Sequence, residues 1–207
     1  MTDLMSQAKL QVAMNDPVLR AATYADVLAA PEDKTAEVIN GALHLSPRPG
    51  WAHGAAASAL GDELGPPFKR GRGGPGGWMI LQEPELHLDS HILVPDLAGW
   101  RRERMPTHPD APFVTVIPDW VCEILSPSTA RRDRTEKKAL YASLGVRYVW
   151  IVDPRYRTLE TFELLDGHWR DVGNFSGEER IRAVPFDAIE FELGNLWADV
   201  EPPPDSP

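Results

Sequence analysis

The alternation of apolar and polar side chains along the chain predicts several strands and a small number of helices. Two apolar runs within residues 37–45 flank Asn40 and Gly41, a dipeptide that is the strongest short signal for a β-hairpin. A helix is expected over residues 51–64, where His53 shares one face with apolar residues at helical spacing. Further strands are expected over residues 78–82, 85–88, 92–100, 120–125, 148–152 and 158–165.

The order of these elements indicates the fold class. A short helix over residues 23–28, with Thr23 as its N-cap, precedes the hairpin, and a loop rich in glycine, proline and basic residues follows over residues 65–77. A second helix is expected over residues 135–144, closed by Gly145. The sequence therefore predicts an α/β or α+β fold, with a central mixed sheet flanked by few helices.

Length and composition suit one globular domain. The 207 residues include 43% hydrophobic and 25% charged residues, which is typical of a soluble protein. We expect a single domain over residues 23–199, a partly flexible arm over residues 1–22 and a disordered, Pro-rich tail over residues 200–207. The single cysteine favours a reducing compartment, and no apolar run reaches membrane-spanning length. We therefore expect a cytoplasmic protein that does not bind a membrane.

The net charge of −10 counts against a protein that grips nucleic acid along its length. Basic residues are nevertheless clustered within residues 69–72, 101–104 and 131–138. Such clusters can surround a site on an acidic protein, although for any one of them a solvated surface is the simpler interpretation.

Two acidic residues lie inside apolar runs, where acids are rare. Asp96 follows Val94 and Pro95, and Glu123 stands in the run over residues 120–125. Burying an unpaired carboxylate is costly, so each of these acids should have a cationic partner or a metal ion. Two carboxylates on neighbouring strands suit Mg²⁺, and pairing with a buried arginine is the alternative for either one.

Lys137 is the cation that the pattern brings nearest to these acids. It shares the inward face of the second helix with Leu140 and Tyr141, whereas Lys138 falls off that face. The alternative is that the Lys137 stem packs on the core while its ammonium extends into water. Asp133 is interpreted as the N-cap of this helix, in a capping box with Glu136 at the third helical position.

These segments together resemble the Uma-two family of endonucleases, in the PD-(D/E)XK nuclease superfamily. The resemblance extends over residues 24–197, and the order and spacing of its motifs make it specific. The segments that carry it are Glu37-Val-Ile-Asn-Gly, His53, Val94-Pro-Asp-Leu-Ala, Glu123-Ile-Leu-Ser-Pro-Ser-Thr, Asp133 to Lys137, Tyr141, and Gly145-Val-Arg-Tyr-Val-Trp-Ile-Val-Asp.

The resemblance implies a restriction-endonuclease-like core and a role for each motif. Asp96 corresponds to the aspartate of the "PD" element and Glu123 to the acid of the "(D/E)XK" element. Leu125 occupies the usual lysine position, and Lys137 on the next helix takes its place in this family. Glu37 and His53 match family positions that line the pocket, although a structural role is the alternative for both.

The implied activity is metal-dependent hydrolysis of phosphodiester bonds. Asp96, Glu123 and the Ile124 carbonyl would hold Mg²⁺ or Mn²⁺, and the Lys137 ammonium should lie within salt-bridge range of Glu123 or Asp96. Nucleic acid, with DNA favoured, is the expected partner, and a homodimer is left open. The alternative is an inactive nuclease-like domain that binds nucleic acid or a protein, which Leu125 and the negative net charge both favour.

Overall fold

A six-stranded mixed sheet forms the centre of the molecule, for which a computed structural model describes residues 20–198, 200 and 201. The strand order is β10-β9-β8-β7-β6-β3, in which β7 and β8 run parallel and every other neighbouring pair is antiparallel. The mixed α+β class is the one predicted. The strands are β3 (Trp78–Gln82), β6 (Leu97–Arg101), β7 (Trp120–Ile124), β8 (Tyr148–Asp153), β9 (Thr158–Leu165) and β10 (His168–Ser176).

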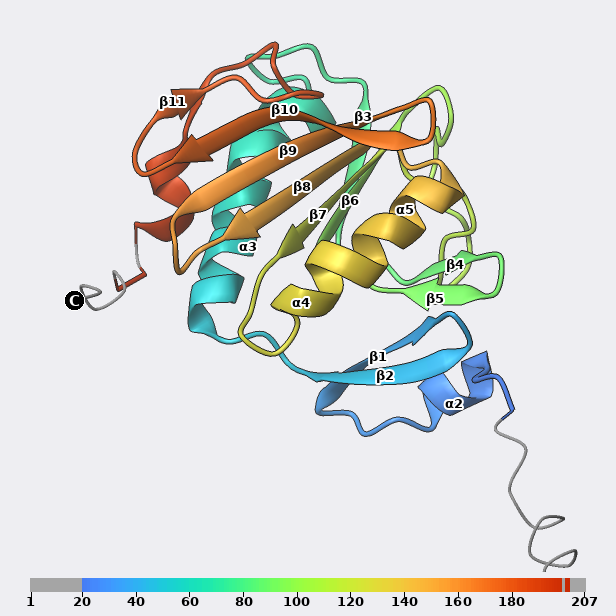
Figure 1. Ribbon diagram of the computed structural model, residues 1–207. Coiled ribbons are helices and arrows are strands. Elements are labelled where there is room, and N and C mark those ends of the chain that lie inside the picture. The colour runs from blue at the N-terminus through green and yellow to red at the C-terminus, as the bar shows by residue number, and fades with distance from the viewer. Residues whose placement is uncertain (1–19, 199, 202–207) are drawn as a thin grey trace, which may run out of the picture.

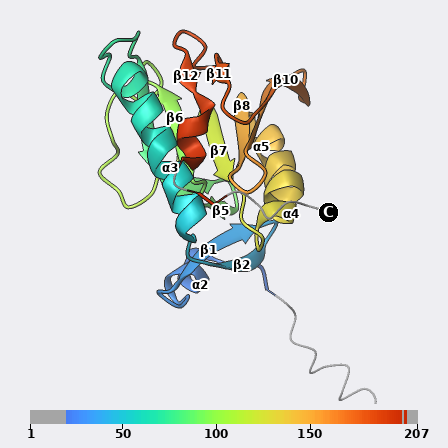
Figure 2. The same ribbon diagram turned by 90° about the vertical axis from the view of Figure 1, so that its left-hand side faces the viewer.

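Helices cover the two faces of this sheet. Helix α3 (Trp51–Leu64) packs on one face, and the crossover between β7 and β8 packs on the other (Figures 1 and 2). This crossover is one continuous helical segment made of α4 (Ala130–Arg132), the π-helical turn η2 (Asp133–Lys137) and α5 (Lys138–Leu144). A parallel pair needs such a crossover, because a tight turn can join only antiparallel neighbours.

The alternation of side chains along β7 determines which face each residue occupies. Trp120, Cys122 and Ile124 belong to the core beneath α3, whereas Val121 and Leu125 belong to the core beneath α5. Successive side chains of a strand point to opposite faces. Glu123 therefore projects toward the crossover helix, on the same face as Leu125.

A second, four-stranded antiparallel sheet lies beside the first, in the order β2-β1-β5-β4. Its strands are β1 (Lys34–Ile39), β2 (Ala42–Pro47), β4 (Leu86–Leu88) and β5 (His91–Leu93). The hairpin predicted around Asn40 and Gly41 is confirmed, with strands longer than expected. Both turn residues have positive φ, 52° and 77°, as a two-residue hairpin turn requires.

The prediction of a single strand over residues 92–100 is wrong. The chain leaves the small sheet after β5, bends at Asp96 and enters the large sheet as β6. Pro95 lacks an N–H group and cannot continue a ladder, which favours a break at this point. Asp96 therefore lies at the junction of the two sheets and not inside a strand.

The second helix also begins earlier than expected. Thr129 is the N-cap of α4, and the Asp133 N–H donates to the Thr129 carbonyl, so Asp133 lies inside the helix. The capping-box interpretation of Asp133 is thus wrong. The loop expected over residues 65–77 opens with a π-helical turn, η1 (Gly65–Lys69).

The ends of the chain agree only in part with expectation. The short helix α2 (Tyr24–Leu28) is present with Thr23 as its N-cap, whereas β11 (Arg180–Ile181), β12 (Phe191–Glu192) and the 3₁₀ helix η3 (Leu193–Trp197) were not predicted. Most of the expected arm and tail lies outside the described residues. Within the described part of the chain, no helix is long and apolar enough to cross a membrane.

Candidate active site

One pocket of about 210 Å³ lies where the hairpin, the start of α3, the end of β7 and the crossover helix meet. The six residues that the sequence assigns to the site all line this pocket, so the structure brings together positions that are far apart in the chain. They are Glu37 on β1, His53 on α3, Asp96 before β6, Glu123 and Ile124 at the end of β7, and Lys137 on η2.

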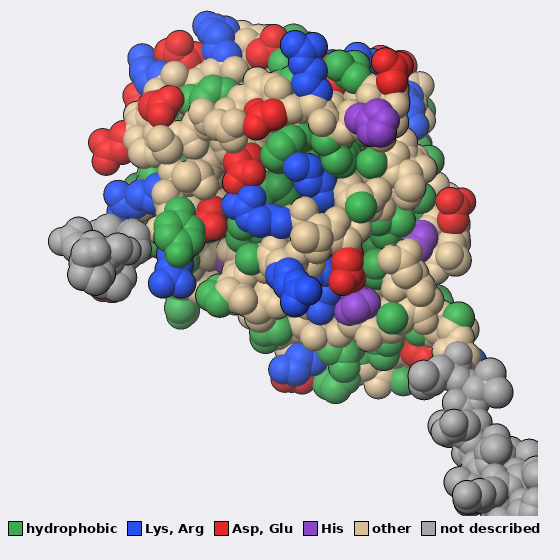
Figure 3. Space-filling model, viewed as in Figure 1, with side chains coloured by type: hydrophobic (Ala, Val, Ile, Leu, Met, Phe, Trp, Pro, Cys, Tyr) green, Lys and Arg blue, Asp and Glu red, His purple; other side chains and the backbone are tan. Residues whose placement is uncertain are grey.

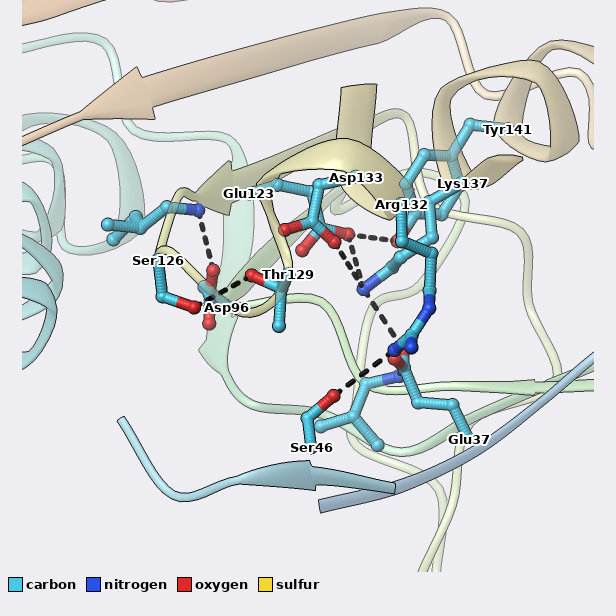
Figure 4. A network of polar contacts seen from close by, with 12 residues as sticks. Glu37, Ser46, Asp96, Glu123, Ser126, Thr129, Arg132, Asp133, Lys137 and Tyr141 are labelled. Atoms are coloured by element: carbon cyan, nitrogen blue, oxygen red, sulfur yellow. Dashed lines mark hydrogen bonds and ion pairs between the residues drawn. The ribbon is translucent and has the colours of Figure 1, made fainter. Parts of the chain in front are cut away.

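Lys137 is the centre of a buried ion-pair cluster. Its Nζ lies 2.8 Å from Glu123 Oε1 and 2.9 Å from Glu37 Oε1, and its side chain is only 3% exposed. Figure 4 shows the three side chains pointing toward one another from the helix, the strand and the hairpin. The predicted approach of Lys137 to Glu123 is confirmed, and the alternative of an ammonium extended into water is not observed.

The protonation of this cluster follows from burial and neighbouring charge. Burial lowers the pKa of Lys137, but Glu123 and Glu37 outweigh it and raise the pKa well above its usual value, so the lysine is charged. Burial raises the pKa of Glu123. The charge of Lys137 opposes this rise, and the charges of the other acids add to it. The Tyr141 hydroxyl donates to Glu123 Oε1 at 2.5 Å, which fixes the orientation of that carboxylate.

Asp96 is held by two contacts on its two oxygens. Its Oδ2 accepts the Ile124 N–H at 2.6 Å, and His53 Nε2 lies 3.0 Å from Oδ1. Burial lowers the pKa of His53, but the hydrogen bond and the charge of Asp96 together raise it above its usual value. The second ring nitrogen of His53, Nδ1, is buried and has no hydrogen-bond partner among the described residues.

Asp133 is a pocket residue that the sequence interpretation missed. Its side chain is buried, and Oδ1 lies 3.9 Å from Lys137 Nζ, one helical turn away. Burial raises its pKa, and the charge of Lys137 opposes that shift. The spacing of four residues between Asp133 and Lys137 was the available signal, because such pairs share a helix face.

The pocket carries an excess of acidic groups. Glu37, Glu83, Asp96, Glu123 and Asp133 line it, against the basic side chains Arg48, His53 and Lys137. A divalent cation would neutralise this excess.

The oxygen ligands that the pocket offers suit a hard cation. No three His, Cys, Asp or Glu side chains of the described residues form a ready-made metal cage. Mg²⁺, however, usually takes one or two carboxylates and keeps several waters. The N–H and C=O of a strand residue point to the same edge, so the Ile124 carbonyl faces the edge where Asp96 accepts the Ile124 N–H. Asp96, Glu123 and this carbonyl thus offer oxygen donors of the kind that Mg²⁺ prefers.

Several hydroxyl groups line the pocket, and one arginine contacts its wall. Ser126, Ser128 and Thr129 line it, and the Ser126 hydroxyl lies 3.0 Å from each of the other two. Arg132 Nη1 donates to Ser46 Oγ at 3.1 Å, which joins the crossover helix to the hairpin. These groups can donate hydrogen bonds to an anion.

The basic clusters noted in the sequence do not form a single positive face. Figure 3 shows basic and acidic side chains interspersed on the face that carries the crossover helix. Arg104 pairs with Asp119 and Arg134 with Glu160, so both form ion pairs at the surface. Lys138, which falls off the inward face of the helix, is half-buried, and its Nζ lies 3.1 Å from the centre of the Phe162 ring.

Comparison with known proteins gives two findings. The family model Uma2, described as "Putative restriction endonuclease", matches residues 21–194. A crystal structure from Anabaena variabilis ATCC 29413, titled "a putative nuclease belonging to DUF820", is similar with a TM-score of 0.69 and 22% sequence identity. The similarity covers 86% of this chain and 98% of that one. No curated protein matches the chain.

Proposed function

Since the chain belongs to the Uma2 family, described as "Putative restriction endonuclease", we propose that it is a metal-dependent endonuclease that hydrolyses phosphodiester bonds, with DNA as its substrate. The observation that carries this proposal is the contact of Lys137 Nζ with Glu123 Oε1 at 2.8 Å, in a pocket that Asp96 also lines. Two carboxylates and a lysine are the groups that the resemblance to PD-(D/E)XK nucleases implies for such a hydrolysis.

Asp96, Glu123 and the Ile124 carbonyl would hold one or two Mg²⁺ or Mn²⁺ ions. A bound ion of this kind lowers the pKa of a coordinated water and polarises the phosphoryl oxygen. Asp96 is already oriented by the Ile124 N–H, and Glu123 by the Tyr141 hydroxyl. The protein thereby fixes both carboxylates before substrate arrives.

Lys137 would stabilise the negative charge that develops on the phosphate. A cation fixed in a site that excludes water acts more strongly than the same cation in solvent. Glu37 is its positioning residue, because Glu37 Oε1 contacts the ammonium at 2.9 Å and also accepts the Val94 N–H at 2.9 Å. His53 holds Asp96 in the same way from α3.

A second candidate function is an inactive domain that binds nucleic acid or a protein. Leu125, which shares the face of Glu123, is buried in the core beneath α5 and offers neither charge nor hydrogen bond. The Lys137–Glu123 pair would then serve only to stabilise the fold. Isothermal titration of the protein with Mg²⁺ and Mn²⁺ separates the two, since the inactive domain should not bind either ion in this pocket.

The direct test is cleavage of supercoiled plasmid and of labelled oligonucleotides with Mg²⁺ or Mn²⁺. The wild-type protein should nick or cut the DNA, and Asp96→Asn should not, while its circular dichroism spectrum stays unchanged. Cleavage by Asp96→Asn at the wild-type rate would place the activity elsewhere, and an inert wild-type protein would favour the inactive domain.

A further inference from the structure

Trp51 is the first residue of α3, and its side chain is 96% exposed. Five other tryptophans are almost completely buried: Trp78, Trp100, Trp120, Trp150 and Trp197. Exposing so large an aromatic surface to water is unfavourable, since the hydrophobic effect scales with apolar area. An indole left in solvent beside a pocket is therefore available to a ligand.

Two adjoining hollows lie at the start of α3, between Trp51 and the candidate active site. One shallow hollow is lined by residues 49–51, 54 and 55, and a second by Pro49, His53, Gly54, Ala57, Ser58, Gln82, Glu83 and Asp96. Both share Pro49 and Gly54, and the second reaches the carboxylate of Asp96. We call these two adjoining hollows, which extend from Trp51 around the start of α3 to Asp96, the α3 trough.

Small side chains keep the floor of the α3 trough low. Gly54, Ala55, Ala57 and Ser58 project little from the helix, and open space surrounds the position where Gly54 would carry a Cβ. Residues two apart on a helix face nearly opposite sides, so the indole of Trp51 stands across the helix from His53. A chain bound at Asp96 must cross these small residues to reach the indole.

The geometry points to a nucleic-acid strand with unpaired bases as the occupant of the α3 trough: we propose that Trp51 stacks on one of its nucleobases. This inference rests on the proposed function, because the trough ends at the phosphodiester site and Arg48 lines the pocket beside it. An aromatic side chain can stack only on a base whose face is free, whereas the bases of a duplex cover one another. The substrate class of the proposed nuclease is thus single-stranded DNA, or a loop, flap or end with unpaired bases.

The test compares binding of a single-stranded oligonucleotide and of a hairpin duplex of similar length, at low salt and in EDTA so that no cleavage occurs. Wild type should bind the single strand more tightly, with quenching of the exposed tryptophan emission. Trp51→Ala should bind it about 5- to 150-fold more weakly, the range that removal of one stacking contact produces. Trp51→Phe should retain most of the affinity. Tyr156→Ala removes an exposed aromatic that lines neither hollow, and should bind like wild type.

The possible outcomes separate this inference from the proposed function. Equal binding by Trp51→Ala and wild type, or no binding of single strands by wild type, overturns the inference. Dissociation of a wild-type dimer by Trp51→Ala in sedimentation, with binding unchanged, would assign the indole to self-association and also overturn it. If Trp51-dependent binding is found but no strand is ever cut with Mg²⁺ or Mn²⁺, the inference stands and the proposed function fails. If Trp51→Ala cuts and binds single strands like wild type, the proposed function stands and the inference about Trp51 fails.

Discussion

Lys137 Nζ lies 2.8 Å from Glu123 Oε1, and each of the two side chains is 3% exposed. The lysine comes from the crossover helix, whereas the position two residues after Glu123 is Leu125, buried in the core beneath α5. Leu125 offers no charge, so the cation beside the Glu123 carboxylate comes from the neighbouring helix and not from the strand.

Removal of the Lys137 charge should affect stability and cleavage together. Lys137→Met leaves Glu37, Glu123 and Asp133 without their buried cation, so we expect the free energy of unfolding to fall by about 3–5 kcal/mol. Saturating Mg²⁺ should restore part of the loss by supplying positive charge, while cleavage stays absent. Urea unfolding with and without Mg²⁺ measures both effects. Lys138→Met is the matched control and should lose no more than about 1 kcal/mol; a Lys137→Met protein as stable as wild type would contradict the proposed cluster.

Asp96→Asn should separate metal binding from folding. The amide oxygen can still accept the Ile124 N–H, so the fold and the metal-free thermal midpoint should change little at a pH above the pKa of His53, where the His53–Asp96 ion pair no longer contributes. The rise in Tm that Mg²⁺ produces in wild type should disappear. Asp119→Asn serves as control, because Asp119 Oδ2 likewise accepts a backbone N–H, from Arg101, but lies outside the pocket. An equal Mg²⁺-induced shift in Asp96→Asn and wild type would rule out Asp96 as a ligand.

The His53–Asp96 contact predicts how stability depends on pH. The pKa of His53 is higher in the folded protein than in the unfolded chain, so the folded state binds this proton more tightly. The resulting stabilisation is complete below the unfolded pKa of about 6.5 and is lost as pH rises through the folded pKa. His53→Gln should therefore cost more stability at about pH 5.5 than at about pH 8.5 in metal-free buffer. A cost that is the same at both pH values would show that His53 is not protonated in the folded protein.

Binding to nucleic acid should be weak and steeply dependent on salt, because the net charge is −10 and the basic residues act locally. Arg48 lines the pocket, and the Arg132 guanidinium donates to Ser46, which also lines it. Arg48→Gln and Arg132→Gln should each reduce the slope of log K against log salt by about 0.7 for a single strand. Titration of a labelled oligonucleotide at several salt concentrations measures the slope. Arg180→Gln, whose arginine pairs with Glu192 on the distant β11–β12 sheet, should leave it unchanged; tight binding with a flat salt response would refute this view of the surface.

Much of this site could be anticipated because its residues break local patterns. Asp96 and Glu123 are acids in apolar runs, and Lys137 lies on the inward stripe of a helix, so each conflicts with simple burial rules. Such conflicts are expected where function, rather than stability, selects a residue.

The features that escaped prediction depend on tertiary structure. Asp133 has the spacing of a capping box with Glu136, but the turn that begins at Ser126 starts the helix earlier and moves Asp133 inside it. The strand through Asp96 divides because its two halves join different sheets, which no local periodicity reveals. The short C-terminal elements β11, β12 and η3 bury apolar residues against α3 and the large sheet without a strong pattern of their own.

The contact between Glu37 and Lys137 joins residues 100 positions apart in the chain. During synthesis, the hairpin that carries Glu37 leaves the ribosome long before the crossover helix exists. At rates of about 5–20 residues per second, an interval of several seconds or more separates the two. Until Lys137 emerges, the carboxylates of Glu37 and Glu123 have no buried cation to hold them together. The nascent chain therefore carries no assembled site, and any activity of this pocket begins only once the crossover helix has docked.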